Sequence, residues 1–143
     1  MEHYRKLERM YLSANMNTQI YQTTEMTVDD ETATISMTID SKYFHALGAI
    51  HGSVYFKLLD DAAFFAVNSI VKDAFVLTTS FNINITRPIS EGKITATGKL
   101  KFKSRSLFVA ESSLVDEKGR EIAFGTGNFA KSRIPLTEDI GYI

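Results

Sequence analysis

Two adjacent aspartates, Asp60 and Asp61, interrupt the longest apolar-rich stretch of this 143-residue sequence, which covers residues 54–71. If the stretch is helical, with ~100° per residue, Lys57 and Asp61 fall on one narrow stripe together with Asn68. Lys57 and Asp61 are four residues apart and can form an ion pair. We therefore interpret Asp61 as a solvated or ion-paired surface charge.

Asp60 has a different setting, because its neighbours on the same helical wheel are all apolar: Phe56, Ala63, Phe64 and Val67. A carboxylate among such side chains is costly unless it has a partner or a task. The pattern predicts that Asp60 acts as a general base or a nucleophile with a tuned pKa. The alternative is an edge charge that reaches water or a lysine of another subunit.

His51, Gly52 and Ser53 stand at the start of the same stretch. A helix N-terminus offers unpaired backbone N–H groups and a positive dipole end, and glycine lets a ligand approach the backbone closely. Such a position can hold a developing oxyanion, and Ser53 could help to cap the helix. The alternative is an ordinary loop-to-helix glycine beside a packed histidine.

The spacing between these two groups restricts how they can work together. Nine residues separate His51 from Asp60, which is ~13 Å along a helix axis and about half a turn around it. Gly52 and Asp60 of one chain therefore cannot both contact the same carbonyl. If both are catalytic, the aspartate must come from a second copy of the chain, so activity would depend on oligomerisation.

The surrounding sequence predicts the elements that position these residues. Helical spacing indicates a short N-terminal helix over residues 4–16, and the apolar stretch predicts a long helix over 52–71. An irregular loop is expected over 41–48, and the tail after Pro135 is expected to be loose. Alternating Thr, Ile, Val and aromatic residues predict strands over 18–28, 32–39, 74–86, 93–103, 107–116 and 121–131.

A helix that is apolar around most of its circumference must be buried on most sides. The simplest solution is an antiparallel sheet wrapped around one long central helix, with a short N-terminal helix outside it. This is an α+β hotdog fold. No repeat, linker or low-complexity tract divides the chain, so we expect a single domain over residues 1–143 with its core at about 18–131.

Composition excludes several classes of function. There are no cysteines, which excludes disulfides, thiol catalysis and Cys-ligated zinc. Only three histidines are present, His3, His45 and His51, so we expect neither a metal site nor a cofactor. The net charge of -1 and the absence of a basic stripe argue against nucleic acid. We find no signal peptide or membrane span, and the expected location is cytoplasmic.

Several sequence segments together resemble the PaaI-like hotdog thioesterase family. The first runs from His45 to Ser53 and is similar to the family pattern Asn-x-x-Gly-x-x-His-Gly-Gly, with Asp60 nine residues after His51. The others are a strand that ends at Arg87-Pro88 and a later strand with a Thr-Ala pair after a glycine turn. The resemblance covers about residues 35–131.

The resemblance implies a site with four parts. Gly52 would supply the backbone N–H that polarises the thioester carbonyl, and His51 would shape the turn. Asp60 of the partner subunit would activate water as a general base or attack directly. His45 takes the place of the family's asparagine, and Thr78 aligns with a hydroxyl residue that assists the aspartate. The coenzyme A portion of the substrate would meet Lys103, Ser104 and Arg105.

Two positions depart from the family pattern. His-Gly-Gly has become His51-Gly52-Ser53, which adds a side chain where the acyl thioester passes. His45 in place of asparagine can still form hydrogen bonds but can also titrate near neutral pH. Both changes bear on substrate preference and pH profile.

The resemblance implies an acyl-CoA thioesterase that works as a homodimer or a homotetramer. We expect the dimer to join two sheets edge to edge, with both helices on the same side. The alternatives are a non-catalytic acyl-CoA binding module and a hotdog hydratase or dehydratase. Phe56, Phe64, Phe65 and Phe81 could form either an apolar pocket or core, so the acyl group stays open.

Overall fold

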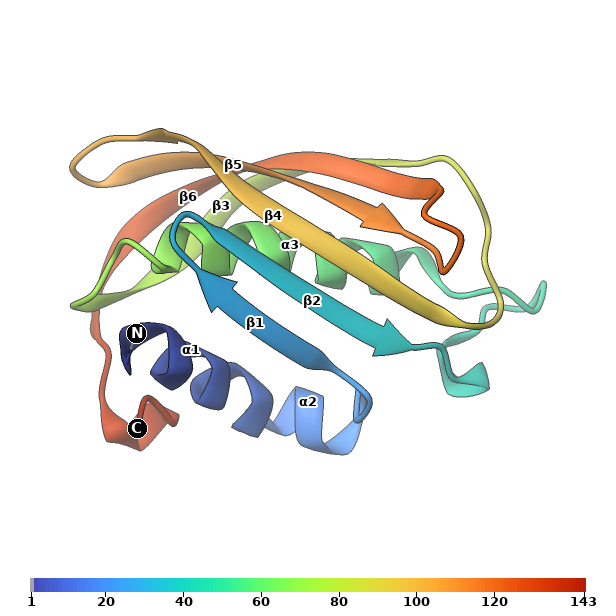
Figure 1. The fold of residues 1–143 in the computed structure, drawn as a ribbon, viewed down its shortest axis with the longest axis horizontal. Coiled ribbons are helices and arrows are strands. Elements are labelled where there is room, and N and C mark those ends of the chain that lie inside the picture. Colours follow the sequence, from blue (N-terminus) through green and yellow to red (C-terminus); the bar gives the residue numbers. More distant parts are fainter. Residues whose placement is uncertain (1) are drawn as a thin grey trace.

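Helix α3 (Gly52–Asn68) is the central element of the computed structural model, which describes residues 2–143 (Figure 1). Its length allows it to run along the inside of the whole sheet. The sheet comes very close to the helix at Gly98, where a Cβ atom would lie 2.2 Å from the carbonyl oxygen of Ala62. Glycine is therefore required there by packing, because any side chain would push the helix away from the sheet.

Six antiparallel strands form one sheet in the order β1-β2-β4-β5-β6-β3, with β1 and β3 at its edges. Most inward-facing residues of the sheet are apolar and pack on α3, as the predicted hotdog fold requires, while Ser112 donates to the Leu59 carbonyl of α3. The α+β prediction is thus confirmed. The strand bounds are β1 Glu25–Asp29, β2 Thr32–Thr38, β3 Ala74–Ile85, β4 Lys93–Lys103, β5 Leu107–Val115 and β6 Glu121–Pro135.

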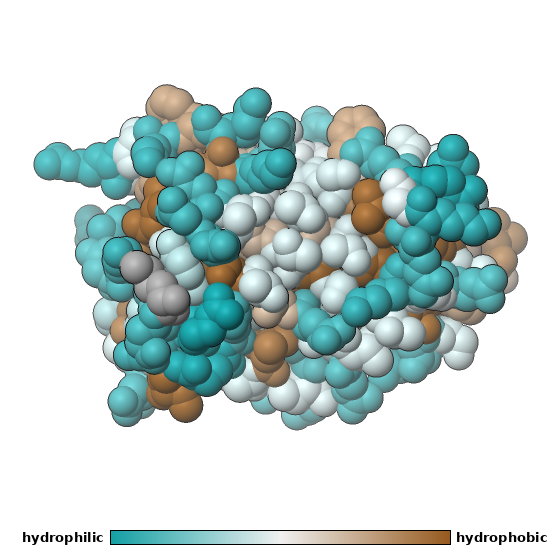
Figure 2. Space-filling model, in the orientation of Figure 1, coloured by the Kyte–Doolittle hydropathy of each residue, from teal (hydrophilic) through white to brown (hydrophobic). Residues whose placement is uncertain are grey.

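The outward face of the sheet is polar but largely uncharged in its middle. Figure 2 shows a band of residues of intermediate hydropathy (white) across β1, β2 and β4. Threonines and a serine alternate there with buried residues, as at Thr34 and Ser36 of β2 and Thr95 and Thr97 of β4. This alternation is typical of an antiparallel sheet with one face on the core.

The N-terminal helices α1 (Glu2–Ser13) and α2 (Asn15–Gln19) cover the side of α3 that the sheet leaves open (Figure 1). The predicted strand over 18–28 is wrong before Glu25, where the chain instead forms α2 and turns. Side chains satisfy the backbone there, because Asn17 donates to the Tyr11 carbonyl and Thr24 to the Tyr21 carbonyl. Such local bonds compete with strand pairing.

The stripe that contains Lys57 and Asp61 is not a solvated surface, which corrects part of our interpretation. The predicted ion pair is present at 2.8 Å, but Lys57 is only 9% exposed because α1 lies over it. The Tyr11 hydroxyl donates to Asp61 (2.7 Å) and accepts from Lys57 (2.8 Å). Asn68, on the same stripe, is fully buried.

The C-terminal tail is packed rather than loose, contrary to our expectation. β6 continues to Pro135, and the short 3-10 helix η2 (Glu138–Ile140) follows it. The two ends of the chain then meet, since the Tyr142 hydroxyl is 2.7 Å from Nδ1 of His3. Within residues 2–143 no helix is long and apolar enough to cross a membrane.

Candidate active site

Asp60 and Thr78 form a hydrogen-bonded pair between the middle of α3 and strand β3. The Thr78 hydroxyl donates to Oδ1 of Asp60 over 2.9 Å. Burial raises the pKa of Asp60 to about 6, against the lowering effects of the Thr78 hydrogen bond and of Lys57, and Asp61 raises it further. A carboxylate with this pKa is ionised at neutral pH yet remains a useful base.

A β-bulge determines which residues of β3 face α3. Val76 and Thr78 point toward the helix, and the register with β6 then shifts between Thr78 and Ser80. Beyond the bulge the odd-numbered residues Phe81 and Ile83 are the partly buried ones that pack on the core. Bulges commonly re-aim side chains beside active sites. Here the bulge lets a polar residue meet Asp60 and apolar residues cover the remainder of the helix.

The start of α3 is capped by His51 and not by Ser53, contrary to our expectation. Nδ1 of His51 accepts from the Ser53 N–H at 3.0 Å and lies 2.8 Å from the Ser53 hydroxyl. Across residues 2–143, the structure shows no acceptor for the Gly52 N–H. A Cβ at Gly52 would meet only Ile85, at an ordinary 3.5 Å. The glycine is thus not required by packing within the chain, and its N–H is free to bind a ligand.

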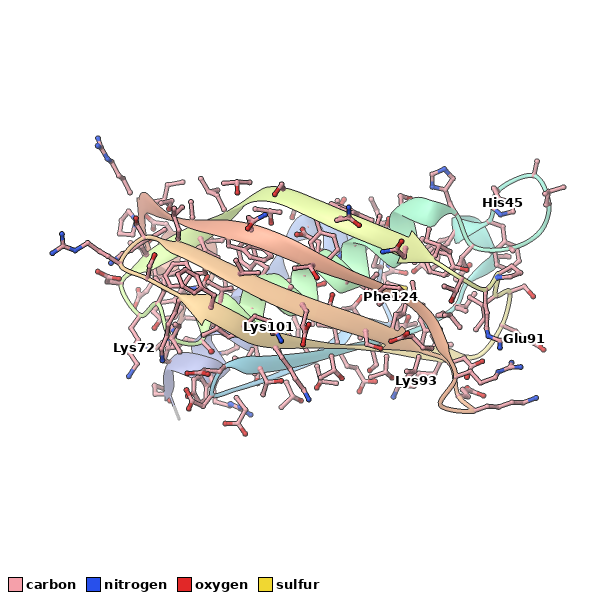
Figure 3. The ribbon with its side chains drawn as sticks, turned by 90° about the horizontal axis from the view of Figure 1, so that it is seen from above. His45, Lys72, Glu91, Lys93, Lys101 and Phe124 are labelled. Atoms are coloured by element: carbon pink, nitrogen blue, oxygen red, sulfur yellow. The ribbon has the colours of Figure 1, made fainter. Side chains whose placement is uncertain are left out.

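His45 belongs to the tight loop that leads into α3. Its Nδ1 accepts from the Leu47 N–H at 3.1 Å, and its own N–H donates to Ala49. The side chain is exposed at the end of the molecule where α3 begins (Figure 3). His45, His51 and Gly52 therefore share one end of the fold, while Asp60 lies eight residues further along the helix, ~12 Å from Gly52.

Lys103 is the last residue of β4, and Ser104 and Arg105 follow in the exposed turn to β5, away from the start of α3. Lys103 pairs with Glu31 at 3.0 Å, and the Ser104 hydroxyl donates to the Leu107 carbonyl. Lys103 stands in register with Thr78 across the intervening strands β5 and β6, which is about three strand spacings or ~14 Å. The hairpin is thus level with Asp60 but distant from Gly52.

One chain therefore holds the predicted residues in three separate places. Asp60 and Thr78 meet, the two histidines and Gly52 share the start of α3, and the β4–β5 hairpin stands apart. Sequence reasoning missed Tyr11, which contacts Asp61 beside Asp60. The helical pattern of the N-terminal segment indicates a buried face that includes Tyr11, but it does not indicate which residue of α3 Tyr11 contacts. Residues 2–143 contain no cluster of three or more residues suited to hold a metal.

The model of the thioesterase superfamily matches residues 47–123, more than half of the chain. The matched region contains Gly52, Asp60 and Thr78. The chain therefore belongs to the thioesterase superfamily. No curated protein matches it.

Solved structures show the same fold. The PaaI protein of the E. coli phenylacetic acid degradation operon matches with a TM-score of 0.84 and 19% identity, over 95% of this chain and 97% of that one. A thioesterase of Haemophilus influenzae matches with 0.78 and 17% identity over 90% of each chain. A thioesterase of Pseudomonas aeruginosa matches with 0.74 and 22% identity, over 90% and 94%. At these identities the likeness establishes the fold, and activity must be argued from the site.

Proposed function

We propose that the protein hydrolyses acyl-CoA thioesters at sites that combine Gly52 of one protomer with Asp60 of its partner. The observation that carries the proposal is the Asp60–Thr78 pair: a half-buried carboxylate with a pKa of about 6 and a single hydroxyl donor. Membership of the thioesterase superfamily supports the reaction type. The free N–H at the positive end of α3 is suited to a developing oxyanion.

The arrangement of β3 supports a shared site. β3 is a 12-residue edge strand, and such an edge can pair with another copy. A two-fold axis that crosses β3 midway between Thr78 and Ile85 would set Thr78 of one protomer opposite Ile85 of the other. Thr78 contacts Asp60, and Ile85 is the neighbour of Gly52. One edge-to-edge dimer would thus bring Asp60 close to the partner's α3 start.

In the proposed reaction, Asp60 takes a proton from water as the water oxygen attacks the thioester carbon. The Gly52 N–H stabilises the oxyanion that forms on the carbonyl oxygen. The C–S bond then breaks, and the coenzyme A thiolate receives the proton from Asp60. Thr78 orients the carboxylate, His45 reaches the water or the carbonyl, and Lys103, Ser104 and Arg105 bind the coenzyme A portion.

Direct attack by Asp60 is the alternative to base catalysis, and an oxygen label found in the Asp60 carboxylate would identify it. A single turnover in H₂¹⁸O with excess enzyme places the label in the released acid if water attacks the thioester. If Asp60 attacks, water can open the resulting anhydride at the Asp60 carbonyl carbon, which places the label in the Asp60 carboxylate, or at the acyl carbon, which places it in the released acid. Mass spectrometry of the peptide that contains Asp60 reads the outcome.

The first test of the proposal is thiol release from acetyl-, hexanoyl-, decanoyl- and phenylacetyl-CoA by the natural chain and by Asp60→Asn. We expect hydrolysis of at least one thioester and a loss of about a hundredfold or more in kcat in the variant. Asp61→Asn is the matched control, because it changes the neighbouring carboxylate, which forms an ion pair with Lys57. Full activity in Asp60→Asn would refute the assignment. A folded natural chain that binds but hydrolyses none of the panel would point to the binding module.

A further inference from the structure

An apolar cavity of about 340 Å³ lies between the terminal segments of the chain and α3. Its lining comes from both termini and from the core: Met10, Tyr11 and Ala14 from the N-terminal segment, Phe65 from α3, Phe75 from β3, Ile134 from β6 and Ile140 from η2. In Figure 1 the same region is where the N-terminal helix and the C-terminal segment lie next to each other under the sheet. The cavity therefore forms where the two terminal segments pack against the central helix and the sheet.

The lining offers nothing to a polar ligand. Tyr11 is the only lining residue with a polar side-chain atom, and its hydroxyl is occupied by Asp61 and Lys57. The volume is roughly twice that of a ~150 Å³ cavity that holds benzene. The occupant that fits is thus an apolar group on the order of ten carbon atoms.

The cavity shares α3 and β3 with the candidate catalytic pair, through Phe65 and Phe75. Phe65 is five residues beyond Asp60 on the same helix, which is ~7 Å along the axis and ~140° around it, so the two side chains leave α3 on different sides. Phe75 is three residues before Thr78 on β3, and Phe64, one turn beyond Asp60, has its ring 5.3 Å from that of Phe75. A chain attached to a carbonyl at Asp60 would have to pass Phe64 to enter the cavity beside Phe75, so only an extended acyl group could reach it.

We propose that this cavity receives the acyl group of the substrate and selects apolar acyl groups much larger than acetyl, such as medium-chain fatty acyl groups. The proposal rests on the proposed thioesterase function and adds its substrate class. Of the four phenylalanines considered from the sequence, Phe65 lines this cavity. Phe56 and Phe81 pack against each other with ring centroids 5.7 Å apart, nearer the start of α3.

The test uses a substitution that narrows the cavity at its solvent-exposed side. Ala14→Phe adds a large side chain at an exposed cavity residue, and Asn15→Phe adds the same side chain at the next exposed position, which does not line the cavity. The quantity to compare is the ratio of kcat/KM for decanoyl-CoA to that for acetyl-CoA. We expect this ratio to fall at least tenfold in Ala14→Phe and to keep its natural value in Asn15→Phe. An unchanged ratio in Ala14→Phe, or an equal fall in both variants, overturns the proposal.

A binding measurement separates failure of the cavity from failure of catalysis. S-decyl-CoA and S-ethyl-CoA are thioethers that cannot be hydrolysed, and their affinities are measured by titration calorimetry. Suppose that no thioester is hydrolysed but S-decyl-CoA binds at least tenfold more weakly to Ala14→Phe than to the natural chain. This result would support the acyl-binding role of the cavity and refute the proposed thioesterase activity. If both chains bind S-decyl-CoA with equal affinity, the acyl-binding role of the cavity is refuted, whether or not thioesters are hydrolysed.

Discussion

The surroundings of Asp60 disfavour its charge through burial and raise its pKa, while Thr78 supports the charge with one hydrogen bond. A general base must be ionised to work. We therefore predict that kcat/KM for a hydrolysed thioester rises with pH and reaches a plateau, with an apparent pKa of about 6. Initial rates between pH 4.5 and 8.5 measure it. A profile that falls over this range would contradict the role of Asp60 as a base.

The same raised pKa has a consequence for stability. A carboxyl group with a folded-state pKa of about 6 and an ordinary value of 3.8 favours the folded state fully below pH 3.8. That contribution is lost as the pH rises through about 6, because the buried group must then carry a charge. We predict that Asp60→Asn raises the melting temperature at pH 8 and has little effect at pH 4. Thermal unfolding at the two pH values checks this, and an equal shift at both would exclude the explanation.

Thr78 offers a more selective test of the site, since its hydrogen bond lowers the pKa of Asp60. Thr78→Val keeps the shape and removes the donor, so the pH profile should shift to higher pH and the rate at pH 6 should fall. Thr79→Val is the matched control, because its hydroxyl donates to the Asn128 carbonyl instead. An identical shift in both variants would mean that the strand and not the hydrogen bond is responsible.

At the scale of elements, α1 packs against α3 through apolar contacts and through the buried polar contacts of Tyr11 with Lys57 and Asp61. Lys57 lies 4.8 Å from the centre of the Tyr11 ring and 5.0 Å from that of Tyr21. Tyr11→Phe would remove the hydroxyl that both Lys57 and Asp61 use, and unsatisfied buried groups cost about 1–3 kcal/mol. We predict a loss of that size in the free energy of unfolding, measured by urea denaturation. Tyr21→Phe keeps a ring over Lys57 and should cost less.

The elements that the sequence predicted well are those with a local and sustained pattern. The helix from Gly52 and the strands from Ala74 onward repeat their spacing over many residues, and the apolar neighbours of Asp60 could be read from one helical wheel. The pairing of Thr78 with Asp60 was predicted only from the family resemblance, because no local pattern indicates which strand residue a helix will contact.

The failures share a physical cause, which is that the deciding contacts are distant in sequence or involve single side chains. Lys57 looked like a surface residue because its stripe is polar, but α1 folds over it. Residues 18–24 have strand-like composition, yet side-chain bonds to the backbone favour a helix and turns. The bulge at Thr79 could not be predicted, because no glycine marks it in the sequence and it depends on how β3 packs over α3.

At the scale of the whole molecule, the distance along α3 between Gly52 and Asp60 makes a prediction about mixed assemblies. Gly52 is the first residue of the helix, a position that accepts proline, and His51 has the extended backbone that must precede a proline (φ -65°, ψ 147°). Gly52→Pro should therefore delete the N–H and leave the fold intact. Mixing it with Asp60→Asn should restore about a quarter of the natural activity, since half of the dimers are mixed and each has one complete site.

This experiment depends on exchange of subunits between the two variants, which mass spectrometry of isotope-labelled chains can verify. Recovery of activity only after exchange supports a site shared by two protomers. Complete exchange without recovery would contradict it, as would an active monomer in gel filtration.

The bulge in β3 also restricts the length of the chain, independently of residue identity. Thr78 and Phe81 both face α3 only because one extra residue stands between them. Loss of that residue would leave the Asp60 partner in place and turn the strand's later apolar residues toward solvent. Distant relatives can therefore exchange side chains along β3 far more easily than they can gain or lose a position there. An alignment of such relatives that places a gap after residue 78 compares inward-facing with outward-facing residues for the rest of the strand.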